Sequence, residues 1–181
     1  MKWYGFVLIF IVVSLFCDFV YMARINHVSQ AFSKIEELDL PTEELALYGQ
    51  EKSLALSAKS LPKEPSVLFF FASWCRPCLI ESPVIAKLAE RKDAPFIGIA
   101  VRDAPERLES FLQKYKNPYQ LIALDPDMKW SKTMRADKIP TAFILNAKGK
   151  AVAKINGNIT EEFYFKTILP FIQELKNEKP L

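Results

Sequence analysis

The stretch that decides the fold runs from residue 67 to residue 78 and reads VLFFFASWCRPC. Its first part, residues 67–71, is an unbroken apolar run of strand length, which is typical of a strand covered on both faces. Its second part ends on Cys75 and Cys78. The segment after it, residues 79–91, has apolar residues at helical spacing, and Pro83 should kink or crowd that helix. The sequence therefore places two cysteines between a buried strand and a helix.

A pair of cysteines separated by two residues is either a redox dithiol or half of a zinc site. Structural zinc takes about four ligands, and the chain has only three cysteines and one histidine. Cys17 and His27 lie in or beside an apolar N-terminal run, far from the pair in sequence. A single histidine also leaves little room for a Ser–His–Asp or Cys–His nucleophile. The composition therefore favours a redox dithiol with no metal and no cofactor.

The position of the pair at the start of a helix suggests a role for each cysteine. A helix N-terminus presents unpaired N–H groups and about half a positive charge, which stabilise a thiolate. Cys75 is therefore the predicted attacking thiolate, and Cys78, one turn into the helix, is predicted to resolve the mixed disulfide. Arg76 adds positive charge and Pro77 fixes the helix start. Trp74 either shields the pair or simply packs beside it.

Two further motifs are candidates for the same site. Glu81 follows Cys78 by three residues and shares its helical face. It either accepts the proton of Cys78, if burial raises its pKa, or is an ordinary glutamate favoured by the helix dipole. Ile139-Pro140-Thr141 precedes a late strand, and a proline belongs at the start of a strand because it cannot pair within the ladder.

Strands and helices alternate along the rest of the chain. Strands are predicted over 45–48, 53–56, 96–101, 121–124, 141–145 and 151–155, and helices over 105–115, 125–134 and 160–176, the last with a possible break at Pro170. Residues 28–38 are predicted to form a short polar helix or spacer. This order indicates an α/β sheet with helices on both faces. The crossover from residue 67 to residue 101 should be right-handed and parallel, and the short turn at 146–149 makes the last two strands antiparallel.

The N-terminus carries a run from Trp3 to Ala23 in which only Asp18 is charged. About 20 such residues cross a bilayer as a helix. We expect an uncleaved membrane anchor over 1–24, a spacer over 25–44 and one domain over 45–181, with Cys17 as an apolar residue of the anchor. Lys2 favours a cytoplasmic N-terminus, which leaves the domain outside the cytoplasm. The net charge of +3 is too small to argue for nucleic acid.

Together, the segment FASWCRPC over 71–78, Glu81, Pro83 and the Ile139-Pro140-Thr141 motif resemble the membrane-anchored thioredoxin-like proteins of the TlpA/ResA and CcmG/DsbE type. The resemblance covers roughly residues 45–177, and residues 117–119, 125–127 and 168–170 look most like CcmG/DsbE. It implies a thioredoxin fold, a central mixed β-sheet flanked by helices. It also implies a cis Pro140 that faces the cysteines, and a functional acid at Glu81.

The same resemblance implies a biological role. It points to a periplasmic reductant, held in the bacterial inner membrane, that reduces the haem-binding cysteines of apocytochrome c or a carrier of them. A membrane reductant of the DsbD type would recharge it. Three features depart from the expected pattern: Thr141 stands where CcmG/DsbE proteins usually have Glu, residues 135–138 lack the usual Gly-Val, and Phe69 stands where classical thioredoxins place a buried aspartate. A reductase or isomerase for other secreted proteins, a disulfide-donating oxidase, and a binding module with a structural disulfide remain alternatives.

Overall fold

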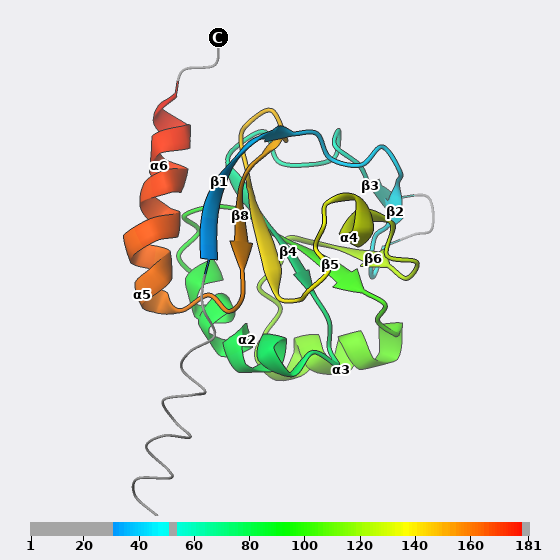
Figure 1. The fold of residues 1–181 in the computed structure, drawn as a ribbon. Coiled ribbons are helices and arrows are strands. Elements are labelled where there is room, and N and C mark those ends of the chain that lie inside the picture. Colours follow the sequence, from blue (N-terminus) through cyan, green and yellow to red (C-terminus); the bar gives the residue numbers. More distant parts are fainter. Residues whose placement is uncertain (1–30, 51–53, 179–181) are drawn as a thin grey trace, which may run out of the picture.

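The computed structural model describes residues 31–50 and 54–178, which fold around one six-stranded sheet (Figure 1). The strand order is β1-β8-β7-β4-β5-β6. The strands are β1 (Ala31–Leu38), β4 (Ser66–Phe71), β5 (Phe96–Val101), β6 (Leu121–Asp125), β7 (Thr141–Leu145) and β8 (Ala151–Asn156). β4 pairs parallel with β5 and antiparallel with β7, so the sheet is mixed. A separate small sheet joins β2 (Leu45–Ala46) to β3 (Ala55–Leu56).

Helices cover both faces of the main sheet. They are α2 (Arg76–Ala89), α3 (Pro105–Tyr115), α4 (Lys129–Thr133), α5 (Glu161–Phe163), the π-helical turn η1 (Tyr164–Ile168) and α6 (Leu169–Asn177). Phe69 packs with buried residues of α2, η1 and α6, whereas its neighbour Phe70 packs with Trp130 of α4 on the opposite face. Successive residues of a strand point to opposite faces, and here both faces are buried. This arrangement explains why β4 reads as a continuous apolar run.

The structure confirms most of the elements predicted from sequence. Strands occur where the apolar runs at 67–71, 96–101 and 141–145 predict them. β4 and β5 are parallel, and β7 and β8 are antiparallel. The helix predicted over 105–115 is α3, and the helix predicted to begin at residue 79 begins at Arg76 and continues through Pro83. Together these elements make the thioredoxin-like α/β fold expected from the sequence.

The short helix or spacer predicted over 28–38 is wrong for the described residues, which form the edge strand β1. β1 pairs antiparallel with β8, and Ala31 lies opposite Asn156. The register shifts between Lys34 and Leu38, and only Phe32 and Ile35 of this strand are partly buried. Their spacing of three residues imitates a helix because the irregularity breaks the alternation of a regular strand. The main sheet thus begins inside the segment assigned to the spacer.

The C-terminal helix predicted over 160–176 is present but not uniform. Thr160 caps its start, where the hydroxyl oxygen accepts a hydrogen bond from the N–H of Phe163 at 3.2 Å. A π-helical turn occupies 164–168, directly before Leu169 and Pro170. Proline has no N–H for the helical ladder, and here the helix accommodates it with a wider turn rather than a break.

The predicted anchor over 1–24 lies outside the described residues. Within residues 31–50 and 54–178, no helix combines the length and apolar character needed to cross a bilayer.

Candidate functional site

The two cysteines lie at the N-terminus of α2 and form a disulfide bond. Cys75 is the N-cap residue, and its Sγ accepts a hydrogen bond from the main-chain N–H of Cys78 at 3.3 Å. Both residues are buried, Cys75 with 4% of its surface exposed and Cys78 with 1%. Pro77 stands in the first turn, as a residue without an N–H should. The helix start thus directs a donor at the sulfur of Cys75, which suits a thiolate there after reduction.

The segment before β7 lies against the sulfur of Cys75. The peptide bond between Ile139 and Pro140 is cis, and the carbonyl oxygen of Ile139 is 3.7 Å from the Cys75 Sγ. Thr141 begins β7 directly after the proline, and its hydroxyl donates to the carbonyl oxygen of Lys138 at 2.5 Å. This hydrogen bond closes the turn that holds Pro140 beside the disulfide.

Glu81 is buried on the face of α2 that it shares with Cys78, with 6% of its surface exposed. Burial raises the pKa of its carboxyl group to about 8, although a hydrogen bond from the N–H of Ile159 opposes that shift. The N–H lies 2.9 Å from the Glu81 Oε2. Burial, and secondarily the charge of Glu81, also raises the pKa of Tyr119 well above its usual range. Glu81 is therefore not an ordinary surface glutamate, and at neutral pH it carries a proton in the oxidised protein.

A loop after β8, residues 157–159, joins the parts of the site. Gly157 donates its N–H to the carbonyl oxygen of Pro140 at 3.1 Å. The side-chain amide of Asn158 donates to the carbonyl oxygen of Pro77 at 2.9 Å, and Ile159 binds Glu81 as described above. Three consecutive residues therefore hold the proline turn, the cysteine turn and the buried acid in one arrangement.

A second loop, after β5, holds the segment that precedes the cysteines. The Asp103 carboxyl group is fully buried. Its two oxygens accept hydrogen bonds from the N–H of Ser73 at 2.5 Å and from the Ser73 hydroxyl at 2.7 Å. The indole N–H of Trp74 donates to the carbonyl oxygen of Arg102 at 3.2 Å. Trp74 itself is 52% exposed. It is therefore not a core residue, and its ring offers a surface beside the disulfide that a partner protein can contact.

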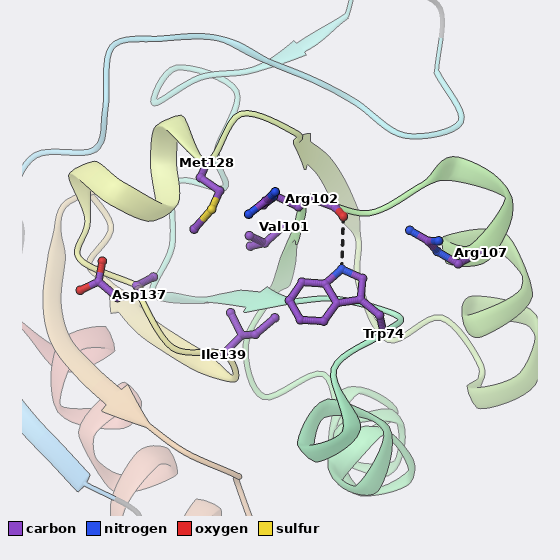
Figure 2. A pocket seen from close by; sticks show the side chains of 8 residues that line it. Trp74, Val101, Arg102, Arg107, Met128, Asp137 and Ile139 are labelled. Atoms are coloured by element: carbon purple, nitrogen blue, oxygen red, sulfur yellow. Dashed lines mark hydrogen bonds between the residues drawn. The ribbon is translucent and has the colours of Figure 1, made fainter.

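A cavity of about 400 Å³ opens beside this tryptophan (Figure 2). Apolar side chains from four separate segments line part of it, and charged side chains line the remainder. The lining residues are Trp74, Val101, Arg102, Arg107, Met128, Ala136, Asp137 and Ile139. Because Ile139 also contacts the Cys75 sulfur, the cavity adjoins the reactive pair.

The structure brings every residue of the predicted site together at the N-terminal end of α2. Cys75, Cys78 and Glu81 lie on the helix, Trp74, Arg76 and Pro77 surround the cysteines, and Ile139, Pro140 and Thr141 form the facing turn. Three further groups of the site were not predicted from the sequence, namely Asp103, Asn158 and the N–H of Ile159. Asn158 carried a faint signal, since an Asn after a glycine favours a tight turn, but nothing in the sequence pairs it with Pro77. No group of three or more His, Cys, Asp or Glu suited to a metal ion occurs in the described part of the chain.

Comparison with known proteins places the chain in a family. A model of the family described as Redoxin matches residues 28–168. The chain belongs to the Redoxin family. The thiol:disulfide interchange protein DsbE of Pseudomonas fluorescens biotype C is 31% identical over 123 residues, which cover 68% of each chain. The thiol:disulfide interchange protein HelX of Rhodobacter capsulatus is 29% identical over 103 residues, covering 57% of this chain and 58% of HelX.

Solved structures show the same fold for this Redoxin-family chain. A secreted disulfide oxidoreductase of Mycobacterium tuberculosis, homologous to E. coli DsbE, matches with a TM-score of 0.60 at 21% identity and covers 74% of this chain and 96% of its own. A secreted thiol-disulfide isomerase from Corynebacterium glutamicum matches with a TM-score of 0.64 at 16% identity, over 81% of this chain and 95% of its own. The chain spans only 58% of HelX and 64% of the DsbE of Xylella fastidiosa.

Proposed function

We propose that this protein is a thiol:disulfide oxidoreductase that reduces protein disulfides outside the cytoplasm. The observation that carries the proposal is the Cys75–Cys78 disulfide at the start of α2, with the Ile139 carbonyl oxygen 3.7 Å from the Cys75 sulfur. A purely structural disulfide does not need a buried acid one helical turn away or an adjoining cavity. Relatives named thiol:disulfide interchange protein support the same assignment.

The reaction uses the dithiol as a donor of two electrons. The Cys75 thiolate attacks one sulfur of a substrate disulfide, forms a mixed disulfide and releases the other substrate sulfur as a thiolate. The Cys78 thiolate then attacks the Cys75 sulfur and releases the second substrate thiolate. The substrate disulfide becomes two thiols after protonation, and the enzyme ends in the disulfide form that the structure contains.

Glu81 exchanges the proton of Cys78 in this scheme. The ionised form of Glu81 accepts that proton when Cys78 attacks, and the protonated form returns it when a reductant opens the enzyme disulfide and Cys78 leaves. Its raised pKa, about 8, suits the second task because the oxidised protein then holds the proton in reserve at neutral pH. Arg76 and Pro77 support the thiolate and the helix start. Trp74 and the turn of Ile139, Pro140 and Thr141 shape the surface that a substrate contacts.

The finer assignment is a reductant in cytochrome c maturation, acting on apocytochrome c thiols or a carrier of them and recharged by a DsbD-type membrane reductant. The resemblance to CcmG/DsbE and the names of the relatives support it. In this assignment residues 3–23 anchor the chain in the bacterial inner membrane, with the domain in the periplasm. A general reductase or isomerase for other secreted proteins is the second candidate, which Thr141 favours because threonine follows the proline in many other thioredoxin-like proteins.

One pair of experiments tests the proposal. In the Cys78→Ser variant the mixed disulfide through Cys75 cannot be resolved, so substrates remain covalently attached and mass spectrometry identifies them. Apocytochrome c among the adducts supports the finer assignment, and a broad set of secreted proteins supports the second candidate. Strong disulfide oxidases have reduction potentials of about −120 mV, and a Cys75–Cys78 potential well below that value supports a reductant. A pair inert to thiol exchange would leave only the structural disulfide.

A further inference from the structure

Arg102 has an unusual backbone conformation next to the site. It follows β5 directly, and its φ angle of 47° lies in the left-handed region that residues other than glycine rarely adopt. Two hydrogen bonds hold it there: its N–H donates to the carbonyl oxygen of Asp125 at 3.1 Å, and its own carbonyl oxygen accepts from the Trp74 indole at 3.2 Å. Strained residues held in this way are concentrated at functional sites.

In this conformation the side chain of Arg102 lines the cavity. Figure 2 shows the Arg102 side chain beside the cavity, between Met128 and Trp74. Val101, Ala136 and Ile139 give the same cavity an apolar part of its lining. Because Trp74 precedes Cys75 in sequence and Ile139 contacts its sulfur, a residue close to a substrate cysteine would enter this space.

The charged side chains around the cavity favour binding of an acidic side chain from a substrate. Arg107 lies 3.9 Å from the buried Asp103 carboxyl group, which already accepts three hydrogen bonds. No carboxylate in the described part of the chain lies within 4.0 Å of the Arg102 guanidinium group. Asp137 lines the same cavity, so its negative charge offsets one of the two positive charges of Arg102 and Arg107. The guanidinium group of Arg102 is therefore available to a carboxylate from outside.

We propose that this cavity selects substrate cysteines that have an acidic residue close by in the sequence. An apolar neighbour of the cysteine occupies the lining, and the carboxylate pairs with Arg102. The inference rests on the proposed thiol exchange at Cys75 and names a preference within it. Arg102 is a specificity-determining residue here, and Asp137 weakens the same preference.

The test compares capped peptides of the form Xaa-Leu-Cys-Leu-Xaa, in which Xaa is Glu, Gln or Lys and the cysteine is disulfide-bonded to methanethiol. The reduced full-length protein, in a non-ionic detergent, converts each peptide disulfide to two thiols while Cys75 and Cys78 become a disulfide. Quenched samples analysed by mass spectrometry give the second-order rate constants. We expect the Glu peptide to react about three- to fivefold faster than the Gln peptide at low ionic strength, and the Lys peptide more slowly than either. The difference should shrink as added salt screens the charges.

Two variants with opposite expected effects make the test specific. Arg102→Gln should abolish the preference, so that the Glu and Gln peptides react at the same rate. Asp137→Asn should increase the preference. Lys148→Gln, which alters an exposed lysine in the 146–149 turn outside the cavity, is the matched control and should leave the preference as it is.

The outcomes separate this inference from the proposed function. Equal rates for the three peptides, or a preference that survives Arg102→Gln, would overturn the inference while leaving thiol exchange intact. Failure of all three peptides to react, in a protein shown to be reduced and folded, would overturn the proposed function itself.

Discussion

The side-chain amide of Asn158 donates a hydrogen bond to the main-chain carbonyl oxygen of Pro77, with 2.9 Å between the two atoms. Pro77 lies between the two cysteines, and Asn158 lies 81 residues later in the sequence. The adjacent Ile159 binds the carboxyl group of Glu81. A single loop thus fixes the position of the buried acid relative to the disulfide.

Replacing Asn158 should therefore affect both stability and chemistry. Asn158→Ala removes the donor, and we expect a loss of about 1 kcal/mol in the free energy of unfolding, measured with urea. Asn158→Asp places a carboxylate against the Pro77 carbonyl oxygen, so we expect a larger loss of stability. In both variants the pH profile of thiol exchange should shift, because Glu81 loses its fixed position. Gln120→Ala, at an exposed amide, is the control. An unchanged pH profile in Asn158→Ala would limit this residue to a structural role.

Glu81→Gln tests proton return to Cys78 during reduction of the enzyme disulfide. The measurement is the rate of reduction by dithiothreitol, expressed as the ratio of the unchanged protein to the variant at each pH, so that ionisation of the reagent cancels. Glu81 is protonated below its pKa of about 8. We expect the ratio to be at least about tenfold at pH 6 to 7 and to approach one above pH 8. A ratio that does not vary with pH would contradict general acid catalysis by Glu81.

The same residue should make the stability of the oxidised protein depend on pH. The folded state raises the Glu81 pKa from 4.5 to about 8, so between these values the folded protein binds more protons than the unfolded chain. Stability is therefore full below pH 4.5 and falls as pH rises to 8, by on the order of a few kcal/mol. Urea unfolding should show that Glu81→Gln flattens this decline. Glu90→Gln changes an exposed residue at the end of the same helix. The stability of this control variant should fall with pH as that of the unchanged protein does.

Asp103 should be important for the segment before the cysteines. Asp103→Ala removes the acceptor for the N–H and hydroxyl of Ser73, and leaving those groups without a partner costs about 1–3 kcal/mol. Asp103→Asn keeps one acceptor oxygen and should cost less. Thermal unfolding measures both effects, and the fluorescence of Trp74 reports whether the segment has moved. Asp127→Asn, at an exposed carboxylate, serves for comparison, and an equal loss there would refute the role given to Asp103.

Gly98 lies against the aromatic rings of Phe71 and Tyr119, which leave no room for a larger side chain. A Cβ atom at this position would lie 2.8 Å from the Phe71 Cε1 and 3.1 Å from ring atoms of Tyr119, and those two rings are stacked with centroids 4.7 Å apart. Gly98→Ala should therefore destabilise the protein by about 1–3 kcal/mol through overpacking. Combining it with Tyr119→Leu should cost less than the sum of the single changes. Additive losses in urea unfolding would show that the ring contact is not the cause.

The central part of the fold could be predicted because its sequence patterns are strong. β4 and β5 are buried on both faces, so their apolar runs need no context. The edge strand β1 could not be predicted, because it is mostly exposed and its register shift between Lys34 and Leu38 removes the alternation. The π-helical turn before Pro170 also depends on packing that composition does not show.

The candidate site divides along the same line. Cys75, Cys78 and Glu81 lie within one short segment, so helical spacing was enough to relate them. Asn158 and Asp103 act through contacts between distant segments, and such pairings arise from tertiary structure alone. The environment of Glu81 likewise depends on the loop at Ile159, which is why sequence left its role open and the structure gives it a raised pKa.

The register of β1 has a geometric consequence for a tethered protein. Ala31 lies opposite Asn156, Asn156 lies opposite Thr141, and Thr141 follows Pro140. The chain therefore enters the sheet at the end that carries the disulfide. If residues 1–24 form the anchor proposed above, the chain from Arg24 to Ala31 can span at most about 25 Å. The reactive edge would then lie close to the lipid surface, within reach of partners embedded in the same bilayer.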